Sequence, residues 1–497
     1  MFKKVLIANR GEIAVRIAGT LREMGVRAVG VYSEPDRGAV HVGACDEAYP
    51  LEGATSAETY LRGERIIEIA KAHGADAIHP GYGFLSENAE FAGRCAAAGL
   101  TFIGPTPDVI RAMGDKIVAK KTLADAGVPV VPGWSGKTNA GAAEFRKRAG
   151  EIGYPVLIKA AAGGGGKGMR VVRAETELDA ALEAAQREAG AAFGDARVFL
   201  EKYISRPRHV EVQIFGDAHG NVVHLFEREC SIQRRHQKII EESPCWGMTP
   251  ALREQICDAA VTAAKAIGYQ NAGTVEFLLD ESGAFYFLEV NTRLQVEHPV
   301  TELVTRLDLV RAQVLVASGE PLPFAQVDIR QHGCAIECRI YAEDPSRGFL
   351  PSTGRILRYV APAGPNIRVD SGVAEGSEVS VHYDPMLAKL IVWGARREEA
   401  IRRAVCALRR YVILGVTTNV EFLRSVLEHP EFAAGRTHTH FLDEHRVAAT
   451  DAAPVPDDAW IAAAIAAQQS TRPSPGAIGA GQPTHDPWQT AGAWRAG

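Results

Sequence analysis

Apolar strand-like segments alternate with helical segments through the first hundred residues, and this alternation limits the fold more than any other feature of the sequence. The strand-like segments are residues 3–8, 27–33, 76–80 and 101–104. Helical patterns lie between them at residues 12–24, 62–74 and 87–99. Strands that alternate with helices form a parallel sheet with helices on both faces. We therefore predict an α/β fold that begins with a doubly wound parallel sheet.

The first strand-to-helix turn reads ANRGEIA and lacks the pattern GxGxxG, so a dinucleotide site is not expected there. A chain of 497 residues is long enough for about three domains. The expected domains are residues 1–114, residues 115–330 with a smaller lid at 131–203, and a mainly antiparallel β domain at 331–446. The tail, residues 447–497, is rich in Ala, Pro and Gly, and DDAWIAAAIAAQQ within it predicts one helix.

Composition excludes several classes of protein. A net charge of −5 argues against a nucleic-acid partner. No stretch reaches the roughly 18 apolar residues of a membrane span, so no membrane partner is expected. The eight cysteines are scattered and form no CxxC pair, which indicates reduced thiols in a cytoplasmic protein.

The segment TVEFLLDESGAFYFLEVN, residues 274–291, predicts a β-hairpin around a polar turn at 280–283. One face is expected to be the core face and carries Val275, Phe277, Leu279, Tyr286, Leu288 and Val290. On the other face Glu276 lies opposite Glu289, with carboxylates close enough to repel by roughly 3 kcal/mol at an effective dielectric of 20. A divalent cation between them would remove this cost, and Asn291 on the same face adds an oxygen ligand. Two solvated glutamates are the alternative interpretation.

The run AAGGGGKGM could be a phosphate-binding lid or a plain mobile turn. It does not match Walker A, because Met169 follows the lysine and glycine, and the flanks VLIK and MRVV both resemble strands. Backbone N–H groups of glycines at a hairpin tip can approach phosphate oxygens and close over a site. Lys159, in the apolar run PVLIKA, requires an anionic partner if it points inward, although an outward lysine is commoner. Lys116 begins a helix, where a lysine is usually solvated.

Further polar residues follow the hairpin on the same face, and a second group of polar residues precedes the hairpin in the sequence. Arg293, Gln295 and Glu297 place a guanidinium, an amide and a carboxylate beside the two opposed glutamates, as an oxyanion site with a general base requires. A surface salt-bridge strand is the alternative. The segment ECSIQRRHQKIIEE adds a basic cluster that suits phosphate or bicarbonate, or else forms a solvated basic face. The cluster consists of Arg234, Arg235, His236 and Lys238.

Taken together, these motifs strongly resemble biotin carboxylase, an ATP-grasp enzyme. The matching segments are GGGGKG, FERECSIQRRHQK, VEFLLD, FYFLEVNTRLQVEH, HPGYGFLSEN, ECRIYAEDP, GFLPSTG and YDPMLAKL. The resemblance covers about residues 1–446. Other ATP-grasp ligases share the lid and the metal pair but lack the combination of SIQRRHQK and RLQVEH. A non-catalytic nucleotide-binding scaffold is disfavoured by the intact polar set.

The resemblance implies a role for each matching position. The ATP site would comprise Lys116, Lys159, Gly165, Gly166, Glu201, Lys202, Tyr203, Ile204, His209, His236, Glu276 and Glu289. The ligands of Mg²⁺ or Mn²⁺, with two ions expected, would be Glu276, Glu289 and Asn291. The bicarbonate site would comprise Lys238, Arg293, Gln295 and Val296, and the biotin site Tyr82 and Arg339. The catalytic residues would be Arg293, Glu297, Arg339 and Lys238, with Glu297 as the base that deprotonates bicarbonate and Arg339 as the residue that stabilises the biotin enolate.

The resemblance also implies a ligase that carboxylates biotin in two stages. Bicarbonate first attacks the γ-phosphoryl of ATP to give carboxyphosphate, and the biotin ureido nitrogen then captures the released CO₂. In this family biotin is attached within a Met-Lys-Met motif, and no methionine follows Met386. Biotin is therefore expected as a substrate on a biotin carboxyl carrier protein or domain outside this chain.

Two further features concern partners. Two segments look most like α subunits of acyl-CoA carboxylases, especially the methylcrotonyl-CoA type: YLRGERIIEIAKAHGADAIHPGYGFLSENAEFA and EDPSRGFLPSTGR. A third segment, THDPWQTAGAWRAG, resembles the start of the domain with which these subunits dock to the carboxyltransferase β subunit. Bacterial members that dimerise carry an arginine and a phenylalanine at positions that are here Gly19 and 365–366. The usual homodimer is therefore in doubt.

Overall fold

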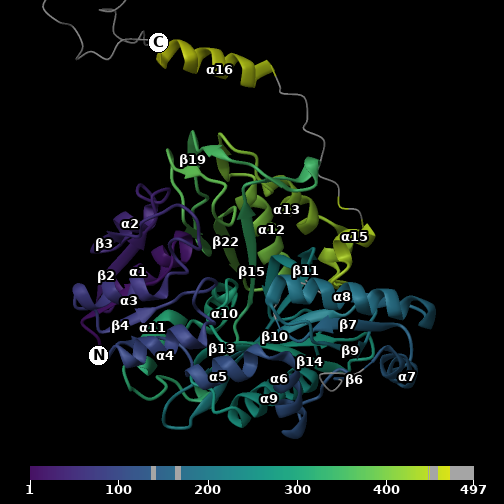
Figure 1. Ribbon diagram of the computed structural model, residues 1–497. Coiled ribbons are helices and arrows are strands. Elements are labelled where there is room, and N and C mark those ends of the chain that lie inside the picture. The colour runs from purple at the N-terminus through teal and green to yellow at the C-terminus, as the bar shows by residue number, and fades with distance from the viewer. Residues whose placement is uncertain (136–140, 163–168, 446, 448–456, 471–497) are drawn as a thin grey trace, which may run out of the picture. The chain divides into compact units, whose positions relative to one another are not determined.

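The computed structural model describes residues 1–135, 141–162, 169–445, 447 and 457–470 (Figure 1). The chain divides into two compact units, Met1–Ala449 and Thr450–Gly497. The described part of the second unit is α16 (Asp457–Ser470), the helix that the Ala-rich pattern predicts. Gly165, Gly166 and the segment THDPWQTAGAWRAG lie outside the described residues.

A parallel sheet near the N-terminus has the strand order β3-β2-β1-β4-β5. Figure 1 labels its strands β2, β3 and β4. Its strands are β1 (Lys4–Ile7), β2 (Arg27–Tyr32), β3 (Glu47–Pro50), β4 (Ala77–His79) and β5 (Thr101–Phe102), and its helices are α1 (Gly11–Glu23), α2 (Val40–Ala44), α3 (Gly63–Ala72) and α4 (Ala89–Ala97). Val5 and Ile7 of β1 join the core that includes α1, whereas Leu6 joins the core that includes Ile66 of α3. Helices thus cover both faces, and the predicted doubly wound sheet is confirmed. The prediction missed α2 and β3, which are too short to show a period.

A smaller antiparallel sheet with the order β6-β9-β7-β8 lies within the segment predicted as a lid. Its elements are β6 (Gly133–Trp134), α7 (Ala142–Ile152), β7 (Val156–Ala160), β8 (Arg170–Val172), α8 (Leu178–Phe193) and β9 (Val198–Lys202). It has a core of its own that includes Phe145, Ile158 and Leu182. Strands β7 and β8 pair antiparallel, so the two segments that flank the glycine run form a hairpin, as predicted.

The third sheet is the largest and has the order β14-β13-β10-β11-β12-β15-β22-β20. Its strands are β10 (Arg208–Gly216), β11 (Val222–Arg234), β12 (Gln237–Ser243), β13 (Asn271–Leu279), β14 (Phe285–Asn291), β15 (Cys334–Tyr341), β20 (Ile367–Ser371) and β22 (Met386–Gly394). The pairs are antiparallel, as expected for the C-terminal region. Because β12 pairs with β15, the C-terminal strands β15, β22 and β20 extend the central sheet, whereas shorter C-terminal strands form separate two-stranded sheets.

Helices cover this sheet, although the region after residue 203 reads in the sequence as mostly strands. They are α5 (Pro107–Gly114), α6 (Lys116–Asp125), α9 (Pro250–Ala266), α10 (His298–Thr305), α11 (Leu309–Ala317), α12 (Arg397–Leu408), α13 (Val420–Leu427), α14 (Pro430–Ala433) and α15 (Phe441–His445). Helix α9 escaped the prediction because alanines supply most of its buried face, and alanine gives little periodic contrast.

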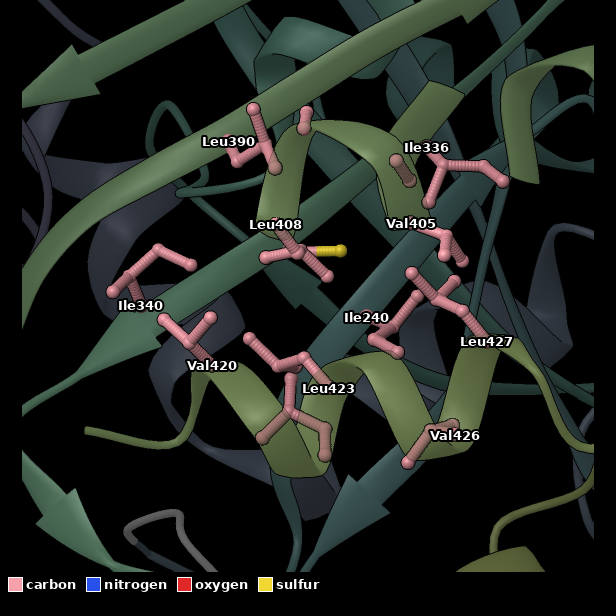
Figure 2. Packing of buried hydrophobic residues seen from close by; sticks show 14 of the residues in the cluster. Ile240, Ile336, Ile340, Leu390, Val405, Leu408, Val420, Leu423, Val426 and Leu427 are labelled. Carbon is pink, nitrogen blue, oxygen red and sulfur yellow. The ribbon is translucent and has the colours of Figure 1, made fainter. Parts of the chain in front are cut away.

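A core of branched side chains fixes the strands that carry part of the site (Figure 2). Ile336 and Ile340 of β15 pack with α12 and α13 in this core. Because successive strand residues point to opposite faces, Glu337 and Arg339 then lie on the other face of β15. That face contacts α10, since Ala335 clusters with Val300 of this helix.

The predicted hairpin forms between β13 and β14, and Glu276 pairs directly with Glu289. A β-bulge after Glu276 then shifts the register, so that Phe277 pairs with Phe287. The predicted core face is therefore wrong at Tyr286 and Leu288: Phe285 and Phe287 take their places in the core. The bulge leaves Leu288 free to line the cavity described below.

Two expectations about composition can be compared with the structure. In the described ranges, no helix is both long and apolar enough to cross a membrane. The eight cysteines all lie within these ranges and are unpaired, in agreement with reduced thiols.

Candidate active site

A cavity of about 410 Å³ is lined by residues of the small sheet, the large sheet and the segment before α15. Nearly all of the site residues expected from the sequence lie around it. These are Lys116, Lys159, Glu201, Lys202, Tyr203, Ile204, His209, His236, Lys238, Glu276, Glu289, Asn291, Arg293, Gln295, Val296, Glu297 and Arg339. Tyr82 is not part of the lining, and the two lid glycines lie outside the described residues.

Lys238 of β12 lies at the centre of a cluster of buried carboxylates. Its Nζ is 2.6 Å from Glu211 Oε2, 2.9 Å from Glu276 Oε1 and 2.6 Å from Glu297 Oε1. Burial would lower the pKa of Lys238, but the carboxylates outweigh it and raise the pKa well above its ordinary value. The lysine is therefore a fixed positive charge at the cavity wall.

Glu276 accepts hydrogen bonds on both of its oxygens. Oε1 accepts from the amides of Asn291 and Gln295, each at 2.8 Å, and Oε2 lies 2.7 Å from His209 Nε2. Burial would raise the pKa of Glu276, but Lys238 and His209 hold it well below the usual range. Glu276 is thus anionic, as a metal ligand must be.

Glu289 is the freer of the two opposed glutamates. Its side chain is 34% exposed, and Lys116 Nζ lies 3.4 Å from Oε2. One buried and one accessible carboxylate, with the amide of Asn291 beside them, form a set of hard oxygen donors that fits Mg²⁺. Asn291 Oδ1 also accepts from Arg293 at 3.0 Å, which leaves one of its lone pairs for a cation.

Glu297, at the start of α10, is held between two cations. Lys238 contacts one oxygen at 2.6 Å, and an Arg339 nitrogen contacts the other at 2.9 Å. Burial would raise the pKa of Glu297, but Lys238 and Arg339 lower it well below its ordinary value. Arg339 also binds Glu241 at 2.5 Å, so β15, β12 and α10 are joined through one guanidinium.

Arg293 and Gln295 extend this polar wall. Arg293 Nε binds Glu87 at 2.9 Å, which ties the segment after β14 to the loop before α4. Gln295 Oε1 accepts from Arg228 at 2.8 Å while its amide donates to Glu276. The guanidinium and the amide therefore lie beside the two glutamates, as the sequence predicts.

The end of β9 and the residues directly after it form another wall of the cavity. Glu201 lies between two lysines, 2.5 Å from Lys159 Nζ and 2.9 Å from Lys120 Nζ. Lys159 thus has the anionic partner that an inward lysine requires. The Lys202 ammonium donates away from the cavity to Gly153 O at 2.7 Å, and the Tyr203 hydroxyl lies 3.2 Å from His440 Nε2.

The predicted basic cluster is not one surface. Lys238 faces the carboxylates, and His236 lines the cavity. Arg234 instead binds Glu343 at 2.7 Å. Arg235 and His236 have positive φ angles and form the turn between β11 and β12. The four basic side chains of the segment therefore do not all point to the same side of the hairpin. The interpretation as a single solvated basic face is wrong.

Tyr82 lies behind the cavity wall, where its hydroxyl donates to Glu12 of α1. Burial and the Glu12 carboxylate raise the pKa of Tyr82 well above its ordinary value, while nearby Arg339 lowers it. The tyrosine is therefore neutral.

The sequence prediction missed several residues that complete the site. They are Glu87, Glu211, Arg228, Gln233 and His440. The alternating pattern HVEVQIF of β10 would have indicated Glu211, which pairs with Glu276 just as Glu276 pairs with Glu289. Three neighbouring strands thus carry a glutamate at one level. Glu87 and His440 come from distant loops and leave no local signal.

An antiparallel sheet with a smaller sheet beside it, and a cavity lined by lysines and opposed carboxylates, defines an ATP-dependent ligase of the ATP-grasp class. Family models agree with this class. They match the biotin carboxylase N-terminal domain at residues 1–110, the carbamoyl-phosphate synthase L chain ATP-binding domain at 115–325 and the biotin carboxylase C-terminal domain at 337–444.

Curated relatives are similar over nearly the whole chain. The methylcrotonoyl-CoA carboxylase α subunit of Dictyostelium discoideum is 49% identical over 99% of this chain and 70% of its own length. Biotin carboxylase of Halalkalibacterium halodurans is 54% identical over 90% of this chain and 98% of its own. A pyruvate carboxylase component of Methanothermobacter thermautotrophicus is 54% identical over 90% of both chains. The chain spans 62% of the Mus musculus methylcrotonoyl-CoA carboxylase α subunit.

A solved structure supplies a ligand-bound comparison. The biotin carboxylase domain dimer of Hydrogenobacter thermophilus 2-oxoglutarate carboxylase, with MgADP, ADP and bicarbonate, has a TM-score of 0.88 at 50% identity. It covers 91% of this chain and 100% of its own. The chain belongs to the biotin carboxylase family and is an ATP-dependent ligase.

Proposed function

We propose that this chain catalyses the first half-reaction of an acyl-CoA carboxylase, in which ATP and bicarbonate carboxylate biotin held by a separate carrier. The observation that carries the proposal is the cavity in which Glu297 lies between Lys238 and Arg339, beside the opposed pair Glu276 and Glu289. This arrangement supports the residue roles that the resemblance to biotin carboxylase implies.

In the first stage, Lys238, Arg293 and Gln295 hold the bicarbonate oxygens. Glu297 accepts the bicarbonate proton, and the bicarbonate oxygen attacks the γ-phosphoryl group, so that ADP leaves and carboxyphosphate forms. Lys116 and Lys159 neutralise the phosphates, because phosphoryl transfer depends mainly on positioning and charge. The hinge residues Glu201, Lys202, Tyr203 and Ile204, with His209 and His236, surround the nucleotide. The resemblance adds Gly165 and Gly166 as nucleotide contacts.

In the second stage, carboxyphosphate releases CO₂, and the resulting phosphate takes the proton of the biotin ureido nitrogen. That nitrogen then bonds to the carbon of CO₂. Arg339 stabilises the biotin enolate, and Tyr82 borders the same subsite. Both stages share one cavity, which keeps carboxyphosphate away from water.

Mg²⁺ or Mn²⁺, as two ions, completes the site. Glu276, Glu289 and Asn291 would hold them. When bound, the cations neutralise the phosphate charge that develops during transfer.

The proposed partners are a biotin carboxyl carrier protein or domain and the β subunit of a carboxyltransferase. The complete assembly is proposed to act on methylcrotonyl-, acetyl- or propionyl-CoA. The methylcrotonyl-CoA type is supported by the similarity to the methylcrotonoyl-CoA carboxylase α subunits of Dictyostelium discoideum and Mus musculus, which are 49% and 54% identical to this chain.

The organisation of the chain is proposed as follows. The domains occupy residues 1–114, 115–330 and 331–446, with the lid at 131–203 and the start of a subunit-docking domain at 447–497.

Cytoplasmic location is supported by the unpaired cysteines, although some relatives are named as mitochondrial. Glycine at position 19 argues against the homodimer of bacterial members.

The test uses the purified chain with MgATP, ¹⁴C-bicarbonate and free biotin. The proposal expects ADP release to require bicarbonate and to rise with biotin, and labelled carboxybiotin to be trapped at alkaline pH. Lys238→Gln should lose both products, because the cavity loses its central cation. Lys265→Gln, an exposed lysine of α9, is the matched control and should keep both. ADP release without any dependence on bicarbonate would contradict the proposal.

A further inference from the structure

The segment that joins β14 to α10 has no regular hydrogen-bond pattern of its own, yet it carries Gln295, Val296 and Glu297. A backbone carbonyl buried in such a segment needs a partner from elsewhere. The carbonyl of Gln295 accepts from His298 Nδ1 at 2.8 Å. The carbonyl of Val296 accepts from Lys389 Nζ at 2.8 Å. Lys389 therefore fixes the peptide plane immediately before Glu297.

Burial of the charged Lys389 side chain at this position costs free energy. Its side chain has 0% exposure, and a buried ammonium requires anionic partners. Glu12 Oε2 lies 3.3 Å from Nζ and Asp370 Oδ2 lies 3.8 Å away. Burial would lower the pKa of Lys389, but Glu12, Glu337 and Asp370 raise it, so the lysine keeps its charge. Apolar side chains of similar volume in place of the whole buried ion pair would often be equally stable, so stability alone does not explain why the pair is there.

Glu12 connects this lysine to the biotin side. It accepts a hydrogen bond from the Tyr82 hydroxyl, and its side chain is 2% exposed. A continuous chain of contacts thus runs from Tyr82 through Glu12 and Lys389 to the Val296 carbonyl. It joins the loop after β4, helix α1, strand β22 and the segment before α10. Neither Glu12 nor Lys389 is part of the cavity lining.

We propose that Glu12 and Lys389 are positioning residues that hold the bicarbonate segment and the biotin-side tyrosine in one fixed arrangement. This inference rests on the proposed function, because it takes the bicarbonate and biotin subsites from there. Lys389 sets where Glu297 and the Val296 peptide meet bicarbonate. Glu12 sets where Tyr82 borders biotin, and its contact with Lys389 makes the two subsites move together.

A purely structural ion pair is the competing explanation, and the chain offers a matched control for it. Arg397 of α12 is also a buried cation that joins a buried glutamate to backbone carbonyls. It binds Glu242 at 2.5 Å and donates to Phe432 O and Ala433 O, each at 2.9 Å. It does not line the cavity. Removal of either cation should lower Tm, whereas only Lys389 should affect bicarbonate.

The experiment measures bicarbonate-dependent ADP release by the full chain carrying Lys389→Met or Arg397→Met. Misplacement of a reacting group by about 1 Å costs up to about 100-fold, so Lys389→Met should raise the KM for bicarbonate roughly 10- to 100-fold while leaving the KM for MgATP unchanged. Arg397→Met should leave both KM values unchanged. Equal bicarbonate KM values in wild type and Lys389→Met would overturn the inference.

A double variant, Glu12→Leu with Lys389→Met, leaves no unpaired charge between the two positions and protects the test against misfolding. It should raise the KM for free biotin as well as the KM for bicarbonate. A rise in neither, in a folded protein, would also overturn the inference. Failure of the proposed function is a different result, since wild type itself would then show no bicarbonate-dependent ADP release.

Discussion

Glu297 shows how neighbouring charges set the chemistry of a single side chain. Its two oxygens contact Lys238 and Arg339, and these cations hold its pKa well below the ordinary value against the effect of burial. A carboxylate so stabilised is a weak base. In the proposed mechanism, bicarbonate takes over the contact with Lys238 before Glu297 accepts a proton. Substrate binding would then activate the proposed base.

Of the two opposed glutamates, Glu289 is the better one to mutate, because its replacement disturbs fewer contacts than replacement of Glu276. Glu276 supports four neighbours, whereas Glu289 contacts Lys116 alone among the described side chains. Loss of the Glu289 charge should raise the Mg²⁺ concentration needed for half-maximal ATP turnover at least about tenfold, or about 1.4 kcal/mol, with Tm unchanged. Glu281→Gln, in the exposed turn of the same hairpin, is the control. An unchanged Mg²⁺ requirement in Glu289→Gln would remove the metal assignment.

Glu241 should give stability a measurable pH dependence. Burial raises its pKa to about 7, even though Arg339 lowers it. Between pH 4.5 and 7 the folded protein then keeps a proton that the unfolded chain has released, so this group makes stability fall as pH rises. In Glu241→Gln the unfolding free energy should fall less between pH 5 and pH 7 than in wild type, by up to about 1.4 kcal/mol per pH unit.

Urea unfolding at both pH values measures this difference. Glu254→Gln, an exposed residue of α9, should behave as wild type. A drop in Glu241→Gln equal to that of wild type would show that Glu241 titrates normally.

At the scale of elements, the hairpin shows what periodicity can and cannot predict. The two strand-like runs and the polar turn between them are enough to place Glu276 of β13 opposite Glu289 of β14. The β-bulge is not visible in that alternation, because an extra residue reverses parity without changing residue type. The prediction consequently assigned Leu288 to the core, whereas the bulge turns it toward the cavity.

A mutation in the small sheet should change the KM for MgATP without changing the KM for bicarbonate. Glu201 of β9 holds Lys159 of β7 and Lys120 of α6 in place, so across the sheet it positions Lys159, which we propose contacts phosphate. Glu201→Gln should raise the KM for MgATP roughly 10- to 150-fold, because the loss of a charge-assisted contact typically costs about 1.5–3 kcal/mol, and should leave the KM for bicarbonate unchanged. Glu175→Gln, an exposed residue of the same unit, is the control. Parallel changes in both constants would contradict a separate role for this sheet.

At the scale of the whole molecule, the large sheet brings the site together. Lys238 of β12 and Arg339 of β15 are on paired strands, although about a hundred residues separate them in the sequence. The sequence predicts the residue types and the parallel sheet at the N-terminus. It does not predict this pairing, because no local pattern determines which distant strands become neighbours. The contacts of Glu87 and His440 escape prediction for the same reason.

We propose that one cavity performs two separable stages, in which Glu297 acts on bicarbonate and Arg339 acts on biotin. The most direct test measures bicarbonate-dependent ADP release beside trapped ¹⁴C-carboxybiotin in wild type, Glu297→Gln and Arg339→Ser. Loss of a general base typically costs about 10²- to 10⁴-fold, so Glu297→Gln should lose ADP release even without biotin. Arg339→Ser should keep most ADP release but lose carboxybiotin, because the enolate has lost its counter-charge. Parallel loss of both products in Arg339→Ser, or loss of carboxybiotin alone in Glu297→Gln, would contradict the account.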